Sequence, residues 1–128
     1  MSDSKASEAS AAILAAWRRV ETIDGIPQAC RPASEDEGYQ AQDALVAAMG
    51  EPVAGYKLGA TSPGAQEIFS VDKPFVGTLF ESSLLQNGAT VAKGGVTLYA
   101  VEAEFVFRFS ADILARAEAY SVDEVMAA

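Results

Sequence analysis

The segment from Thr97 to Phe109 has the most strand-like sequence in this chain. Side chains alternate between the two faces of a strand, so residues two positions apart share a face. The pattern predicts a strand with one fully apolar face and one face that holds two carboxylates. The apolar face consists of Val101, Ala103, Phe105, Phe107 and Phe109, and the other of Leu98, Ala100, Glu102, Glu104, Val106 and Arg108.

The two glutamates of this segment are the first candidate functional residues. At a rise of roughly 3.3 Å per residue, the Cα atoms of Glu102 and Glu104 lie about 6.6 Å apart. Burying two like charges unpaired is costly, and a shared divalent cation relieves that cost. The alternative is a solvated face on which Arg108 is a partial counter-charge, since antiparallel sheets commonly leave one face in water. The spacing alone favours this second interpretation.

Composition excludes several classes of function. The chain has 128 residues, 50% hydrophobic content and a net charge of −9, which fits one ordered domain or a piece of a larger one. With no basic cluster, nucleic acid and anionic membranes are not expected as partners. No apolar run approaches the roughly 20 residues of a membrane helix, so we expect a soluble, cytoplasmic protein.

The residue types that are scarce also limit the chemistry. The chain contains no histidine, which removes Ser-His-Asp hydrolysis and an imidazole zinc site. Any metal is then held by oxygen atoms, which indicates Mg²⁺ or Mn²⁺. Cys30 is the only cysteine, so no intrachain disulfide forms and a reducing compartment fits best. We interpret it as a small packing residue rather than a nucleophile.

The chain divides by its local signals at residue 51 into a helical segment, 1–51, and the first part of a β-rich domain, 52–128. The first segment is expected to hold a helix from Ser7 to Val20, with apolar residues Ile13, Trp17 and Val20, and a second helix. Ser34 and Glu37 form a capping-box pattern at the start of the second helix, and Gly50 with Pro52 ends it. Its apolar stripe is Ala41, Leu45, Ala48 and Met49.

The second segment reads as short strands, turns and helix starts. We expect a strand at Val53–Gly59, a short helix at Pro63–Phe69, a turn at 72–74, an extended piece at 76–80 and a turn at 87–88. Lys93-Gly94-Gly95 leads into the glutamate-bearing strand. Ser121 and Glu124 form a second capping box, whose helix stops after about one turn at Ala128. Because such short helices are uncommon, we expect a chain truncated at its C-terminus.

Four motifs in order resemble the fumarylacetoacetate hydrolase superfamily, in its 2-keto-4-pentenoate hydratase / 2-oxo-hexenedioate decarboxylase branch. They are Gly55-Tyr-Lys-Leu-Gly-Ala-Thr-Ser-Pro63, Val71-Asp-Lys-Pro74, Gly77-Thr-Leu-Phe80 and Val101-Glu-Ala-Glu-Phe105. The resemblance implies an α+β fold, with two N-terminal helices before a β-rich mixed fold, in an enzyme about twice this long. It also implies a homo-oligomer and a Mg²⁺ or Mn²⁺ ion held by Glu102 and Glu104, with a third glutamate beyond residue 128.

The resemblance also implies roles for residues of the first three motifs. Lys57 is expected to donate or shuttle a proton, and Asp72 to position Lys57 or a water. Leu79, Thr61 and Ser62 are expected to contact the substrate. Each has an ordinary alternative: Lys57 as an outward-pointing strand lysine, Asp72 as a turn residue, and Ser62 as the cap of the helix that Pro63 begins. Gly55 and Gly59 permit close approach of a ligand or form a bulge.

Two classes of function follow. The first is a metal-dependent lyase that hydrates a 2-hydroxy-2,4-dienoate to a 4-hydroxy-2-oxo acid, with a 2-oxo-3-hexenedioate decarboxylase as its close alternative. In the resembling family the members that cleave carbon–carbon bonds typically use a histidine, so its absence favours the hydratase. The second is a catalytically silent fragment without its third metal ligand, and we expect the 128-residue chain alone to be inactive.

Overall fold

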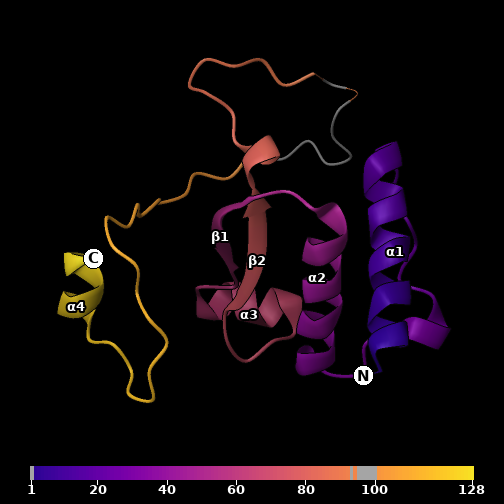
Figure 1. The fold of residues 1–128 in the computed structure, drawn as a ribbon, viewed down its shortest axis with the longest axis horizontal. Coiled ribbons are helices and arrows are strands. Elements are labelled where there is room, and N and C mark those ends of the chain that lie inside the picture. Colours follow the sequence, from indigo (N-terminus) through magenta and orange to yellow (C-terminus); the bar gives the residue numbers. More distant parts are fainter. Residues whose placement is uncertain (1, 93, 95–100) are drawn as a thin grey trace. The chain divides into compact units, whose positions relative to one another are not determined.

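The computed structural model describes residues 2–92, 94 and 101–128 (Figure 1). Contacts divide the chain into two units, residues 1–98 and 99–128, which are described separately. The elements are α1 (Asp3–Arg19), α2 (Glu35–Met49), β1 (Val53–Gly59), α3 (Pro63–Phe69), β2 (Phe75–Phe80) and α4 (Val122–Ala127), with short 3-10 helices at Gln28–Cys30 and Glu81–Ser83. Helices beside a small antiparallel sheet are consistent with the expected α+β class.

Helix α1 begins four residues earlier than the expected start at Ser7. Ser2 is the reason, because its side-chain oxygen accepts a hydrogen bond from the backbone N–H of Lys5 at 3.4 Å. The helix ends where Val20 takes a left-handed conformation with φ 53°. The backbone N–H of Val20 then bonds carbonyls of the last turn, which is an ordinary way to close a helix.

Small residues rather than the expected apolar stripe bury the inner face of α1. Its buried residues are Ala6, Ala9, Ser10, Leu14 and Ala16, whereas Trp17 is 48% exposed. Helices α1 and α2 lie side by side (Figure 1), and Ala9, Cys30 and Ala41 form the cluster between them. Cys30 is buried, which confirms its role in packing.

Helix α2 has the predicted bounds because both of its ends are encoded locally. Ser34 accepts a hydrogen bond from the backbone N–H of Glu37 at 3.3 Å, and Gly50 closes the helix at φ 65°. The Glu37 carboxylate accepts at 2.7 Å from the N–H of Ala33, one residue before the capping-box position. This bond is the main cause that lowers the pKa of Glu37. Of the expected apolar stripe, Ala41 is buried and Ala48 is exposed.

Strands β1 and β2 pair antiparallel and form a hairpin around α3. The predicted bounds of β1 and α3 are confirmed, and β2 starts one residue before the predicted extended piece. The register shifts by one between Val53 and Gly55, which leaves Ala54 as an extra residue. The turns expected at 72–74 and 87–88 are also confirmed.

Two contacts join strand β2 to the helices within the first unit. Phe80, at the end of β2, is 2% exposed and packs edge-on against Trp17 of α1, with ring centroids 6.0 Å apart. The hydroxyl oxygen of Tyr39 on α2 accepts a hydrogen bond from the backbone N–H of Val76 at 3.1 Å. Both contacts of the helical pair are with β2.

The predicted strand at 97–109 is wrong in its described part. Residues 97–100 lie outside the described residues, and 101–109 have no regular secondary structure and are exposed. Strands are held by bonds to neighbouring strands, and the sheet in the described part of the chain contains only β1 and β2. Phe105, on the expected apolar face, is 96% exposed. The lead-in at 93–95 is described only at Gly94.

The second capping box is confirmed. The Ser121 side chain accepts from the N–H of Glu124, and the Glu124 carboxylate accepts from the N–H of Ser121.

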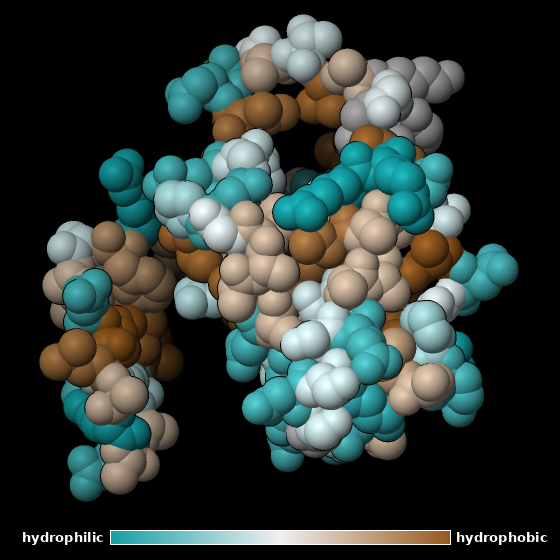
Figure 2. All heavy atoms as spheres, turned by 45° about the vertical axis from the view of Figure 1, so that its right-hand side comes forward, coloured by the Kyte–Doolittle hydropathy of each residue, from teal (hydrophilic) through white to brown (hydrophobic). Residues whose placement is uncertain are grey.

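Figure 2 shows hydrophobic side chains at the surface, interspersed with hydrophilic ones. Within the described residues, no helix has the length and apolar character that crossing a membrane requires. The domain boundary at residue 51 stays a prediction.

Candidate functional site

One face of the hairpin carries two of the predicted site residues. Lys57 lies opposite Gly77, and Leu79 lies opposite Gly55. Residues directly opposite one another share a face, and so do residues two apart on a strand. Lys57 and Leu79 are therefore diagonal neighbours on one face, at a typical Cα separation of about 7–8 Å. The structure thus brings together two residues that are 22 positions apart in the sequence.

Glycines surround Lys57 on this face. No described atom lies within 4 Å of a Cβ placed on Gly55, and a Cβ on Gly77 meets only a carbonyl oxygen at 3.9 Å. Gly59 differs, because a Cβ there would lie 2.3 Å from the ring of Phe75. The structure assigns Gly59 to packing against that ring, and Gly55 to the end of the bulge. Lys57 itself is exposed, as in the ordinary interpretation of a strand lysine.

Asp72 lies in the turn between α3 and β2 and lines a cavity of about 480 Å³. The other lining residues are Glu35, Ser70, Val71, Lys73 and Phe75. Phe75 also belongs to the face that carries Lys57, since it pairs with Gly59. The cavity at Asp72 and the Lys57 face are therefore adjacent, with the Phe75 ring between them.

A salt bridge spans the same cavity. The Lys73 ammonium lies 2.9 Å from the Glu35 carboxylate of α2, and this hydrogen bond is the main cause that raises the pKa of Lys73. Both side chains are about half exposed, so the pair contributes little stability. Sequence reasoning missed Glu35 and Tyr39. Their spacing of four residues on a predicted helix is the signal that places them on one face.

Thr61 and Ser62 lie just before α3. Ser62 accepts a hydrogen bond at 3.3 Å from the N–H of Ala65, which confirms the helix-cap interpretation. Thr61 is exposed. Their contact with substrate stays a prediction.

Glu102 and Glu104 belong to the second unit and are exposed in its irregular segment. Their carboxylate oxygens are the donor type that Mg²⁺ and Mn²⁺ prefer. Within the described residues, however, no group of three or more acidic, cysteine or histidine side chains is placed to hold a metal ion. The donor chemistry fits the ion, and a three-carboxylate site is not assembled in the part of the chain that the structure describes.

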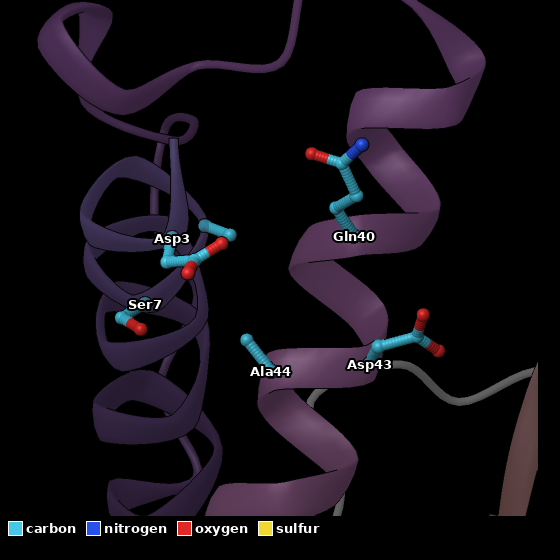
Figure 3. A pocket seen from close by; sticks show the side chains of 6 residues that line it. Asp3, Ser7, Gln40, Asp43 and Ala44 are labelled. Atoms are coloured by element: carbon cyan, nitrogen blue, oxygen red, sulfur yellow. The ribbon is translucent and has the colours of Figure 1, made fainter. Parts of the chain in front are cut away.

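A second cavity, of about 350 Å³, lies between α1 and α2 (Figure 3). It is lined by Asp3, Ala6, Ser7, Gln40, Asp43 and Ala44. In Figure 3, Gln40 and Ala44 point toward α1, whereas the Asp43 carboxylate points away from it. The two carboxylates do not converge, so this cavity has no arrangement suited to a cation. No sequence motif signals it.

Two curated proteins are similar to this chain along most of its length. The "2-keto-4-pentenoate hydratase" of Paraburkholderia phymatum is 30% identical over 125 residues, which cover 94% of this chain and 48% of that protein. The "2-keto-4-pentenoate hydratase 2" of Dechloromonas aromatica is 32% identical over 124 residues, which cover 91% of this chain and 46% of that protein. The chain thus spans about half the length of the curated relatives it matches.

The comparisons with protein-family models and with solved structures point to no other class of protein. No protein-family model matches the chain. No solved structure matches it, so the specific fold implied by the resemblance is not confirmed by a structural neighbour. The two matches support a relationship to hydratases, in part, over the half of their length that this chain spans.

Proposed function

We propose that this chain belongs to a metal-dependent lyase that adds water to a 2-hydroxy-2,4-dienoate and yields a 4-hydroxy-2-oxo acid. The observation that carries the proposal is the similarity to two proteins named as 2-keto-4-pentenoate hydratases over more than nine tenths of this chain. The placement of Lys57 and Leu79 on one hairpin face, beside the cavity of Asp72, is consistent with it.

The proposed roles are those that the resemblance implies, and the positions of the side chains agree with them. Lys57 stands on a face where Gly55 and Gly77 add no side chain, so a flat conjugated acid can reach its ammonium. That ammonium donates or shuttles the proton during ketonisation. Asp72, from the neighbouring cavity, orients Lys57 or the water that is added.

Leu79 provides an apolar contact on the same face. Thr61 and Ser62 lie at the start of α3 and offer hydroxyls to the substrate oxygens.

Glu102 and Glu104 are the proposed ligands of Mg²⁺ or Mn²⁺. A bound ion would supply Lewis-acid stabilisation of the negative charge on the 2-oxygen of the substrate. The chain contributes two carboxylates to this site, and other positions are left to water, substrate or further protein oxygens. The donor type of the two glutamates supports this part of the proposal.

The first experiment measures turnover of 2-hydroxypenta-2,4-dienoate by its loss of absorbance in the presence of Mn²⁺. In an active preparation, Lys57→Ala should lower kcat on the order of 10²-fold or more, because it removes a proton-transfer group. Lys5→Ala on α1 is the control and should leave kcat unchanged. Normal turnover in Lys57→Ala contradicts the role of Lys57.

The second experiment measures Mn²⁺ binding by calorimetry. Glu102→Gln and Glu104→Gln keep the side-chain size but remove the negative charge, so each should weaken binding. Glu118→Gln, an exposed glutamate of the same unit, is the matched control. Equal affinities in all four proteins would exclude the two glutamates as ligands.

A second candidate function is a chain that is catalytically silent by itself. The observation that favours it is that no three-carboxylate group is present among the described residues. Turnover by the isolated 128-residue chain would exclude this candidate, and metal binding without turnover would support it.

A further inference from the structure

Helix α2 contacts the turn that carries Asp72 at two points. Glu35 and Tyr39 lie four residues apart, which places them on one face of the helix. Glu35 binds the ammonium of Lys73 at 2.9 Å, and Tyr39 accepts from the N–H of Val76 at 3.1 Å. The two contacts bracket a stretch of four residues that begins directly after Asp72.

The Tyr39 contact also fixes the outer edge of β2. Val76 pairs with Leu58 on β1, yet its N–H donates to Tyr39 of the helix. This N–H therefore points away from β1, toward α2. A strand edge left without partners is free to slip or to pair with other strands, and a helix that covers it prevents both. Tyr39 thus holds the start of β2 in a defined register, three to four residues after Asp72.

Glu35 acts on the other side of the turn. Its carboxylate lines the same cavity as Asp72, and its partner Lys73 is the residue next to Asp72. The raised pKa of Lys73 is consistent with a maintained contact, and its main cause is the hydrogen bond with Glu35. An exposed pair of this kind contributes little to overall stability, so its effect is on the position of the turn.

We infer that Glu35 and Tyr39 are positioning residues, which hold the 72–76 segment against α2 and so set the place of Asp72 beside the Lys57 face. This inference rests on the proposed function for the chemical role of Asp72, but the contacts themselves do not. Neither side chain is assigned a contact with substrate. They act through Lys73 and Val76.

The first test follows backbone amides of the 128-residue chain by NMR. Tyr39→Phe keeps the ring and removes the acceptor, so exchange of the Val76 N–H should accelerate about tenfold, the change expected for about 1.4 kcal/mol of lost protection. The amide signal of Asp72 should move as well. Tyr56→Phe, an exposed tyrosine of β1, is the matched control and should change neither. Unchanged Val76 exchange and an unmoved Asp72 signal in Tyr39→Phe overturn the inference.

The second test uses reversal of charge, which separates positioning from general stability. Glu35→Lys should shift the Asp72 and Lys73 amide signals, and Glu35→Lys combined with Lys73→Glu should restore them. A double variant that stays shifted as far as Glu35→Lys overturns the role of the ion pair. Glu35→Gln provides a milder variant if Glu35→Lys does not fold.

The kinetic test links the inference to the proposed reaction. In an active preparation, Tyr39→Phe should lower kcat about tenfold with KM nearly unchanged, because a displaced Asp72 acts on the reacting atoms rather than on binding. Glu35→Lys should also lower kcat, and adding Lys73→Glu should restore it. If the double variant keeps the low kcat of Glu35→Lys, the result counts against the inference. If the NMR changes occur but Lys57→Ala leaves the turnover of 2-hydroxypenta-2,4-dienoate normal in an active preparation, the positioning contacts stand and the proposed function is what fails.

Discussion

The two units of this chain are ordered by different kinds of contact. All buried residues in the described part of the chain lie within residues 2–92, where the helices and the hairpin pack against one another. In residues 101–128 none is buried. Hydrophobic side chains are present in both units, so composition does not explain the difference. What differs is the packing of apolar side chains against partners from distant parts of the sequence, such as Trp17 for Phe80.

The second unit has a group of short-range polar contacts around Arg116, besides a longer-range bond in which the Ser110 hydroxyl donates to the carbonyl of Ala128 at 2.6 Å. The guanidinium donates to both carboxylate oxygens of Glu124, each at 2.9 Å, and lies 3.7 Å from the centre of the Tyr120 ring. The Tyr120 hydroxyl donates to the carbonyl of Leu114 at 2.6 Å. The bonds around Arg116 span at most eight residues in sequence. Local contacts of this kind organise a loop and one helical turn, whereas a strand requires a neighbour.

The largest expected effect breaks the first unit at its main long-range contact. Phe80→Ala removes the most buried large side chain and should lower the free energy of unfolding by about 3–5 kcal/mol. Phe105→Ala, at 96% exposure, should change it by less than about 0.5 kcal/mol. Urea unfolding followed by circular dichroism measures both. Equal losses in the two variants would show that the contrast between the units is mistaken.

A smaller effect is expected where a glycine meets a ring. In Gly59→Ala the new Cβ would clash with the ring of Phe75, which packs edge-on against Phe69 at 5.6 Å and has to give up part of this contact if it shifts. We expect a loss of about 1–3 kcal/mol from overpacking. Gly77→Ala on the same face meets only one atom, at 3.9 Å, and serves as the control in the same urea measurement. A stable Gly59→Ala variant would place Phe75 elsewhere.

The cap of α2 tests how local signals act inside a packed unit. Ser34→Ala removes the acceptor for the N–H of Glu37 and should cost about 1 kcal/mol. Ser34→Asp retains an acceptor and should recover most of this loss. The measurement is the melting temperature of both variants and of the parent chain. Equal melting temperatures of Ser34→Ala and Ser34→Asp would argue against the cap.

The smallest effect concerns the second unit and its pH dependence. The bond with Arg116 is the main cause that lowers the pKa of Glu124 from 4.5 to about 2. A carboxyl group with a lowered pKa favours the ordered state above the pKa of the disordered chain, and this contribution is lost as the pH falls. The order of α4 should therefore persist above about pH 4.5 and disappear between there and about pH 2.

Carboxyl NMR titration of Glu124 provides the measurement. Arg116→Ala should return its pKa toward the ordinary value, whereas Arg108→Ala should leave it low. If the pKa of Glu124 is the same in Arg116→Ala as in the parent chain, the ion pair does not account for the local order of this unit.

The sequence predicted those features whose causes lie within a few residues. The serine caps of α2, α3 and α4, the proline at the start of α3 and the glycine at the end of α2 each determine a boundary through one or two local bonds, whereas the equally local Ser2 cap of α1 was missed. That Lys57 and Leu79 share a face was not predicted, because it depends on the register between β1 and β2 as well as on strand alternation.

Features that depend on distant partners were not predictable in the same way. The contact of Phe75 with Gly59, the salt bridge of Glu35 and Lys73 and the packing of α1 through small residues all depend on how separate elements meet. The strand expected at 101–109 failed for the same reason, because alternation describes a strand's faces but does not supply its neighbour.

The extra residue in β1 determines how this hairpin tolerates changes in chain length. Deleting Ala54 would join Val53 to Gly55 and restore an even ladder, with Lys57 still opposite Gly77. Deleting a residue between Gly55 and Lys57 would shift the pairing by one and turn Lys57 to the opposite face. Insertions and deletions at the bulge are thus absorbed locally, whereas the loss of Tyr56, which lies between Gly55 and Lys57, reverses which face carries the lysine.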